Sequence, residues 1–206
     1  MNAGKVYKFN PLAIIMKIYI NKELDKIREY VADVLQENLT KPFLEIEDLI
    51  DIKSADECII IQKDFNKNFI DKNSGLLIFD KDIAKYHDLI SDNNIIMAGI
   101  RHFKAKDHDL LKKIKYYSMK EISFEGIEET CNAIMSACRA FKSMNVIINS
   151  DVLDPAFNMN DNIPGGLSTR ELIYLLQRIK LIKNLNVVQI ITEDEMLGAK
   201  LAIELS

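Results

Sequence analysis

Residues 147–171 read IINSDVLDPAFNMNDNIPGGLSTRE, and this stretch carries the strongest structural signal in the chain. It starts at the end of an apolar run typical of a buried strand, and Asp151 and Asp154 follow it closely. A Pro-Gly-Gly turn then leads to residues 168–171 (Ser-Thr-Arg-Glu), which match the capping box that opens many helices. Because open α/β sheets bind ligands where buried strands end, we expect a site near Asp151.

The chain on both sides of this stretch alternates between short apolar runs and amphipathic segments. The runs predict strands at residues 12–19, 58–62, 75–79, 94–100, 116–117, 146–148 and 185–191. The amphipathic segments predict helices at residues 22–38, 108–115 and 124–141, a helix after 168, and a terminal helix that a second capping box opens at 192–195. This alternation favours a largely parallel sheet covered by helices, in one domain over residues 1–206.

Composition excludes several classes of protein. The net charge of −4 has both signs interspersed, so we expect no nucleic-acid partner. No apolar run approaches the roughly 20 residues that a membrane-spanning helix needs, and the N-terminal run lacks a signal-peptide cleavage site, so we expect no membrane partner. Three cysteines in apolar settings fit free thiols in a reducing compartment, and we expect a cytoplasmic protein.

The opening stretch resembles the late metal-binding motif of the ureohydrolase family, which includes arginases and agmatinases. That motif reads roughly Ser-Phe-Asp-x-Asp-x-Leu-Asp-Pro-Ala-Phe, followed by Gly-Gly-Leu-Ser/Thr-x-Arg-Glu. Residues 153–157 (Leu-Asp-Pro-Ala-Phe) and 165–167 (Gly-Gly-Leu) fix the alignment. Residues 95–101, 114–122, 185–189 and 198–205 resemble further elements of the family. The resemblance implies a three-layer α/β/α sandwich with a mainly parallel sheet, in a truncated, reduced arginase-like fold.

The resemblance also implies where the family's paired Mn²⁺ ions would be held. The aligned ligand positions are Phe65, Asp80, Asp82, Ala84, Asn149 and Asp151. Only Asp80 and Asp151 keep the family residue, whereas Phe65, Ala84 and Asn149 are degenerate positions. The family's Glu that holds the guanidinium falls on Gln189. A paired-metal site needs several carboxylates and imidazoles, so these losses predict that the binuclear site and its hydrolysis are gone.

Two interpretations therefore stay open. In the first, the chain is a pseudoenzyme without a cofactor and has a binding, regulatory or subunit role, in a homo-oligomer or a hetero-oligomer with an active paralogue. In the second, it hydrolyses linear amidines, as arginase, agmatinase or formiminoglutamase do, or other C–N bonds, in a remodelled site.

That remodelled site would be metal-free or would hold a single Mg²⁺, Ca²⁺ or Mn²⁺ on Asp80, Asp82 and Asp151, with Gln189 contacting the substrate. No residue is assigned as a catalytic acid or base. Carboxylates this close repel one another, so a bound cation, Lys63, Lys81 or water must relieve the repulsion.

Overall fold

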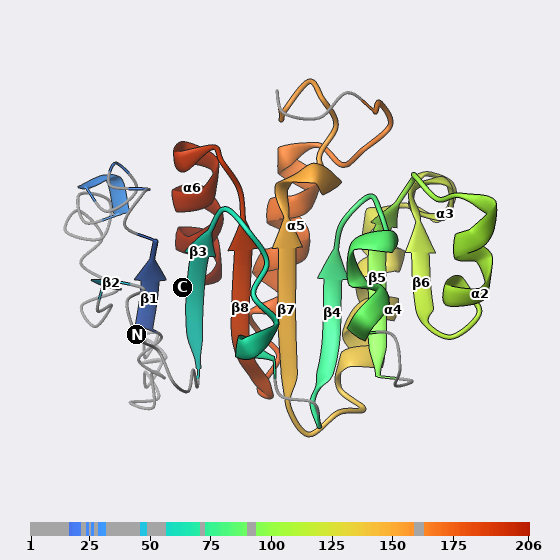
Figure 1. Cartoon of the computed structure of the whole chain (residues 1–206), viewed down its shortest axis with the longest axis horizontal. Coiled ribbons are helices and arrows are strands. Elements are labelled where there is room, and N and C mark those ends of the chain that lie inside the picture. Colours follow the sequence, from blue (N-terminus) through green and yellow to red (C-terminus); the bar gives the residue numbers. More distant parts are fainter. Residues whose placement is uncertain are drawn as a thin grey trace, which may run out of the picture.

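One parallel sheet organises the molecule. The computed structural model describes residues 17–21, 24, 26, 29–31, 46–48, 57–70, 73–89, 94–158 and 163–206. Its strands, all parallel, lie in the order β2-β1-β3-β8-β7-β4-β5-β6 (Figure 1). Their bounds are β1 Lys17–Ile20, β2 Ile46–Asp48, β3 Cys58–Gln62, β4 Gly75–Phe79, β5 Ile95–Ile100, β6 Lys115–Ser118, β7 Met144–Asn149 and β8 Leu185–Ile191. The predicted parallel sheet is thereby confirmed.

The central strands are short apolar runs because both of their faces are covered. Every residue of β3, β4, β5 and β7 is buried, as continuous apolar runs in parallel sheets are. Strands β7 and β8 lie between β3 and β4, although they follow both in the chain. This order brings the carboxyl ends of four strands from distant parts of the sequence to one edge of the sheet.

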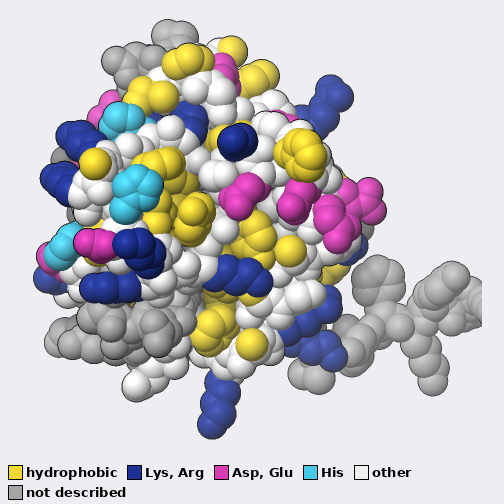
Figure 2. All heavy atoms as spheres, turned by 90° about the vertical axis from the view of Figure 1, so that its right-hand side faces the viewer, with side chains coloured by type: hydrophobic (Ala, Val, Ile, Leu, Met, Phe, Trp, Pro, Cys, Tyr) yellow, Lys and Arg dark blue, Asp and Glu magenta, His cyan; other side chains and the backbone are white. Residues whose placement is uncertain are grey.

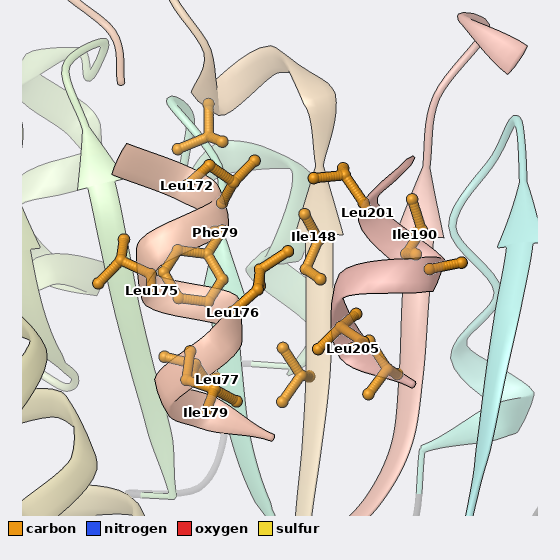
Figure 3. Close-up of a cluster of buried hydrophobic side chains, with 14 of the residues drawn as sticks. Leu77, Phe79, Ile148, Leu172, Leu175, Leu176, Ile179, Ile190, Leu201 and Leu205 are labelled. Atoms are coloured by element: carbon orange, nitrogen blue, oxygen red, sulfur yellow. The ribbon is translucent and has the colours of Figure 1, made fainter. Parts of the chain in front are cut away.

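Longer helices cover one face of the sheet. They are α3 Met119–Glu125, α4 Ile127–Cys138, α5 Thr169–Ile179 and α6 Glu195–Leu205, and α4, α5 and α6 lie behind the strands in Figure 1. Figure 3 shows leucines of α5 and α6 packed on side chains of β4, β7 and β8. Burying one such leucine contributes about 2 kcal/mol, so this face anchors the sheet.

In the part of the chain that the structure describes, 3-10 helices and one short α-helix cover the opposite face. They are η1 Lys67–Phe69, η2 Ala84–Leu89 and α2 His108–Leu111, which follows η3 Ala105–Asp107. Tyr86 of η2 and Leu111 of α2 bury their side chains there against β4 and β5. In Figure 1, η1 and η2 lie in front of the sheet.

The single helix expected over residues 124–141 is wrong. Gly126 has a φ of 91°, a conformation that side-chain-bearing residues rarely adopt, and it separates α3 from α4. A capping box of Ser118 and Glu121 begins α3, a signal that the sequence carried and the helical periodicity obscured. Phe124 therefore lies on α3, where it is 91% exposed.

The two predicted capping boxes have different outcomes. Ser168 and Glu171 form a full capping box at the start of α5, as predicted. The box expected at residues 192–195 is wrong, because Asp194 is the N-cap of α6 and accepts from the backbone N–H of Leu197. Thr192 instead accepts a hydrogen bond from the N–H of Asp194, which shapes the turn before the helix.

Part of the predicted N-terminal structure lies outside the described residues. Residues 17–19 of the strand expected at 12–19 lie in β1, which continues to Ile20, and Lys26 and residues 29–31 of the helix expected at 22–38 are helical. No helix among the described residues is long and apolar enough to cross a membrane.

Candidate functional site

A cleft of about 580 Å³ opens at the carboxyl edge of the sheet. Its walls come from the turns after β3, β4, β7 and β8, where the arrowheads end in Figure 1. Phe65, Lys85, Tyr86, Asn149 and Asp151 are among the residues that line it. The edge of the sheet where a site is expected therefore has a cleft, in the position that open parallel sheets use for ligands.

Asp80 lies at the base of the cleft, directly after β4, and its side chain is fully buried. Its carboxylate accepts from the Tyr86 hydroxyl at 2.8 Å and from Asn149 Nδ2 at 2.8 Å, and it lies 3.5 Å from Lys85 Nζ. Burial raises the pKa of Asp80, and the Lys85 charge and the Tyr86 hydrogen bond act against that rise. Each of these neighbours donates to Asp80 or carries positive charge, an environment that suits an anion.

Asn149, at the end of β7, connects the two family carboxylates. Its Oδ1 accepts from the backbone N–H of Asp151 at 3.0 Å, so its Nδ2 faces Asp80 and donates at 2.8 Å. A carboxylate in this position would instead face the oxygen of Asp80. Both the amide oxygen and the amide nitrogen of Asn149 thus have a hydrogen-bond partner within the protein.

Asp151 is paired by lysines of the turn after β4. Lys85 Nζ lies 2.7 Å from Asp151 Oδ2, and Lys81 Nζ lies 3.8 Å from the same atom. Burial lowers the pKa of Lys85, but the charge of Asp80 and the hydrogen bond to Asp151 outweigh it, so the pKa is raised. Lys81 was among the expected neutralising groups, whereas Lys85 was missed, because its reach depends on the shape of a turn that sequence periodicity does not describe.

The other degenerate positions line the turns around the cleft. Asp82 Oδ1 accepts from the backbone N–H of Ala84 at 2.8 Å, so this carboxylate closes its own turn. The Phe65 ring packs edge-on against the Tyr86 ring, with 5.7 Å between centroids. Tyr86 and its packing were not predicted from the sequence.

Gln189 of β8 is used within the protein. Its side chain is buried, and Oε1 accepts from Gln62 Nε2 at 2.7 Å and from the backbone N–H of Asn66 at 3.3 Å. In this arrangement its amide oxygen holds the turn after β3 to β8.

The predicted ligands Asp80, Asp82 and Asp151 are not gathered into one set. Asp80 and Asp151 share Lys85, whereas Asp82 caps the turn at Ala84. Across the described ranges, no group of three or more His, Cys, Asp or Glu side chains has the arrangement of a metal site. The single-cation site stays a prediction.

Arg101, at the end of β5, fixes the segment after β7 and was missed as a site residue. Its guanidinium donates to the backbone carbonyls of Asp151, Val152, Leu153 and Ile163, at 2.8–3.1 Å. The planar fork of arginine suits several carbonyls at once. Arg101 therefore sets the direction in which the segment carrying Asp151 leaves the sheet.

Asp154 closes the same segment on itself. Its carboxylate accepts from the backbone N–H groups of Ala156 at 3.0 Å and of Gly165 at 2.7 Å. These hydrogen bonds, with smaller contributions from Gly166 and Arg101, lower the pKa of Asp154. The Pro-Gly-Gly turn is thus the closing point of a loop.

Comparison with solved structures gives the same architecture at low sequence identity. Arginase from Bacillus caldovelox superposes with a TM-score of 0.70 at 11% identity, over 92% of this chain and 96% of that one. Arginase from Entamoeba histolytica, solved with L-ornithine, gives 0.65 at 12% identity, with the same coverage. Formimidoylglutamase from Bacillus subtilis gives 0.66 at 15% identity, over 92% of this chain and 84% of that one.

Comparison by sequence gives a match to a family model. No curated protein matches the chain. The model of the arginase family matches residues 64–192, more than half of the chain. This range contains β4 to β8 and the cleft residues Phe65, Lys85, Tyr86, Asn149 and Asp151. By this match and by its fold, the chain belongs to the arginase family.

Proposed function

We propose that this protein is a degenerate ureohydrolase, without the paired manganese site and without hydrolytic activity, which keeps its cleft for a binding or subunit role. The observation that carries the proposal is the hydrogen bond from Asn149 Nδ2 to Asp80 Oδ2, at 2.8 Å. At this aligned ligand position the side chain donates to its neighbour, whereas a metal ligand must offer a lone pair.

The rest of the donor set does not fit two metal ions either. Phe65 and Ala84 have no side-chain lone pair to offer, and the ring of Phe65 packs against Tyr86. Asp80 and Asp151, the two carboxylates that remain at family positions, lie against the same lysine. Two dications held close together need several anionic ligands to offset their charge, and these residues do not supply them.

The cleft itself supports a binding role. Its volume of about 580 Å³ falls within the range of roughly 300–1,000 Å³ for small-molecule pockets. Charged side chains of both signs and the Phe65 and Tyr86 rings line it. Such a lining suits a small polar molecule that carries both charges, bound without being hydrolysed.

The surface beside β6 supports a subunit role. Phe103, Tyr116 and Phe124 are 43%, 37% and 91% exposed at this end of the sheet. Figure 2 shows this side of the molecule, where hydrophobic side chains lie between basic groups and a cluster of acidic ones. We propose that another chain of this family covers this side, either a second copy or an active paralogue.

Metal analysis and an activity assay test the loss of hydrolysis. Purified protein, dialysed with Mn²⁺ and then freed of loose metal, should contain much less than one equivalent by elemental analysis. It should release no urea from arginine or agmatine, and no formamide from formiminoglutamate. Two tightly held Mn²⁺ ions with turnover would contradict the proposal. One held Mg²⁺, Ca²⁺ or Mn²⁺ with turnover would favour the hydrolase of linear amidines with ligands Asp80, Asp82 and Asp151.

Sedimentation velocity tests the subunit role. The chain alone, or mixed with an active paralogue from the same cell, should sediment as an oligomer, and Phe124→Ser should shift it toward the monomer. Leu181→Ser, at a 63% exposed position away from β6, is the matched control. A monomer in both experiments would contradict assembly through this side.

A further inference from the structure

The ammonium group of Lys85 lies between the two carboxylates that the family would use for metal. Its Nζ is 2.7 Å from Asp151 Oδ2 and 3.5 Å from Asp80 Oδ2. Lys85 belongs to η2 after β4, and Asp151 to the 3-10 turn η4 Ser150–Val152 after β7. One side chain thus joins two turns that are 66 residues apart in sequence.

Charge balance shows why this position matters. Asp80 is fully buried, and an unpaired buried carboxylate is costly, so a cation must accompany it. Lys85 supplies the cation to Asp80 and Asp151 together, and Lys81 lies 3.8 Å from Asp151. Two carboxylates therefore face two ammonium groups, which leaves no excess negative charge on Asp80 and Asp151 together to attract a dication.

We propose that Lys85 is the resident cation of the cleft: a tethered ammonium that stands between Asp80 and Asp151 in place of a metal ion and keeps divalent cations out. The inference deepens the proposed loss of the paired-metal site and rests on it. In this view Lys85 is the residue that compensates the charge of Asp80 and Asp151 without the paired metal ions. Removing the lysine side chain should leave two facing carboxylates that recruit a hard divalent ion.

The first test is Lys85→Met, which keeps the aliphatic stem and deletes the charge. In EDTA its Tm should fall by about 5 °C, because Asp80 loses its closest positive charge. MnCl₂ or MgCl₂ at millimolar concentration should restore most of that loss, because an ion that binds only the folded state stabilises it. The same salts should leave the Tm of the wild-type protein unchanged.

Three variants control this result. Lys85→Arg retains the cation and should keep its Tm in EDTA within about 2 °C of the wild type. Lys112→Met removes an exposed lysine paired with Asp109 at 3.0 Å and should change neither Tm nor the response to metal. Lys85→Met with Asp151→Asn leaves Asp80 as the one carboxylate of the pair, so it should stay as destabilised in EDTA as Lys85→Met and lose the response to Mn²⁺.

The outcomes separate this inference from the proposed function. If wild-type protein binds Mn²⁺ as tightly as Lys85→Met, both are wrong. If neither protein responds to Mn²⁺, or if Lys85→Met is as stable as wild type in EDTA, the role of Lys85 is wrong and the loss of the metal site still stands. If Lys85→Met is insoluble, calorimetric titration of Mn²⁺ into Lys85→Gln gives the same decision.

Discussion

The two segments that line the cleft are built differently. The described part of the segment after β7, residues 149–158 and 163–167, is held mainly by hydrogen bonds to its backbone, from Arg101 and to Asp154. The segment after β4, residues 80–89, starts with backbone hydrogen bonds from Arg101 and His102 to the carbonyl of Lys81. Side chains hold the rest of it: Tyr86 donates to Asp80, and Lys85 pairs with Asp80 and Asp151. In the first segment, the residues that match the family pattern shape the chain itself, so they are needed whether or not a metal is present.

The second segment shows the converse. Apart from Asp80, the side chains at its aligned ligand positions make no hydrogen bond, among the described residues, to backbone outside their own turn. Asp82, for example, accepts from the backbone N–H of Ala84. Under the proposed loss of the metals, these positions are free to change, provided that the charge of Asp80 stays compensated. The contrast predicts that the late segment tolerates substitution poorly for steric and backbone reasons, and the early one for electrostatic reasons.

The largest expected effect is at the glycine that closes the late segment. A Cβ on Gly166 would lie 2.5 Å from the backbone nitrogen of Asp154 and from the carbonyl carbon of Leu153. Because backbone atoms must move, Gly166→Ala should destabilise the protein by about 3 kcal/mol in urea unfolding. Gly165→Ala is the control: it meets no atom within 4 Å and should cost only the strain of its positive φ, about 1 kcal/mol. Equal costs would contradict the steric account.

Asn149→Asp tests where the two segments meet. The change removes the donor to Asp80 and puts a second carboxylate beside it, which should cost about 2–3 kcal/mol at neutral pH in urea unfolding without metal. Asn132→Asp, at an exposed position on α4, should change stability by less than about 0.5 kcal/mol. An Asn149→Asp protein as stable as the wild type would show that the amide does not matter to Asp80.

Arg101→Lys tests the anchoring of the late segment. A lysine keeps the charge but cannot donate to four carbonyls, so we expect a loss of about 2 kcal/mol in urea unfolding. Hydrogen exchange of the backbone amides at residues 151–154 should become faster. The reason is that the carbonyls of residues 151–153 lose Arg101 as their donor, so the segment opens more often. Arg178→Lys, at an exposed position where the guanidinium contacts Asn132 at 3.4 Å and the thiol of Cys131, should change stability by less than about 0.5 kcal/mol. Unchanged exchange in Arg101→Lys would remove the distinction between the segments.

The smallest effect is a difference in the sign of the pH dependence. The pKa of Asp154 is lowered by its backbone hydrogen bonds. Its contribution to stability is therefore complete above pH 3.8, the ordinary pKa of an aspartate, and is lost as the pH falls through the folded pKa. The pKa of Asp80 is raised by burial, so its contribution is complete below 3.8 and lost as the pH rises through the folded pKa.

Unfolding of Asp154→Asn and Asp80→Asn between pH 3 and 7 checks these signs. The stability advantage of wild type over Asp154→Asn should shrink in acid, whereas wild type should gain on Asp80→Asn in acid. Asp109→Asn, at an exposed position, should run parallel to wild type. Curves with the same slope for both carboxyl groups would contradict the contrast.

Much of the fold was predictable, because local patterns encode it. Strands such as β3 and β4 are continuous apolar runs, and the Ser168 capping box marks the start of α5 without reference to distant residues. The break at Gly126 was missed because Phe124, three residues before Ile127, extends the apolar spacing of α4 in the sequence, although its side chain is exposed on α3. Whether a glycine lies within a helix or ends it depends on its φ, which composition does not show.

The sequence by itself determined that the chain belongs to the arginase family, because residue types and short spacings carry that information, and from the same spacings it predicts that most metal-ligand positions are replaced. Only the tertiary structure decided which side chains meet in the cleft. Lys85 meets Asp151, and Asn149 meets Asp80, across 66 and 69 residues, because β4 and β7 lie side by side. Which charges become neighbours is a property of strand order in the sheet, and strand order is set by the packing of the whole chain.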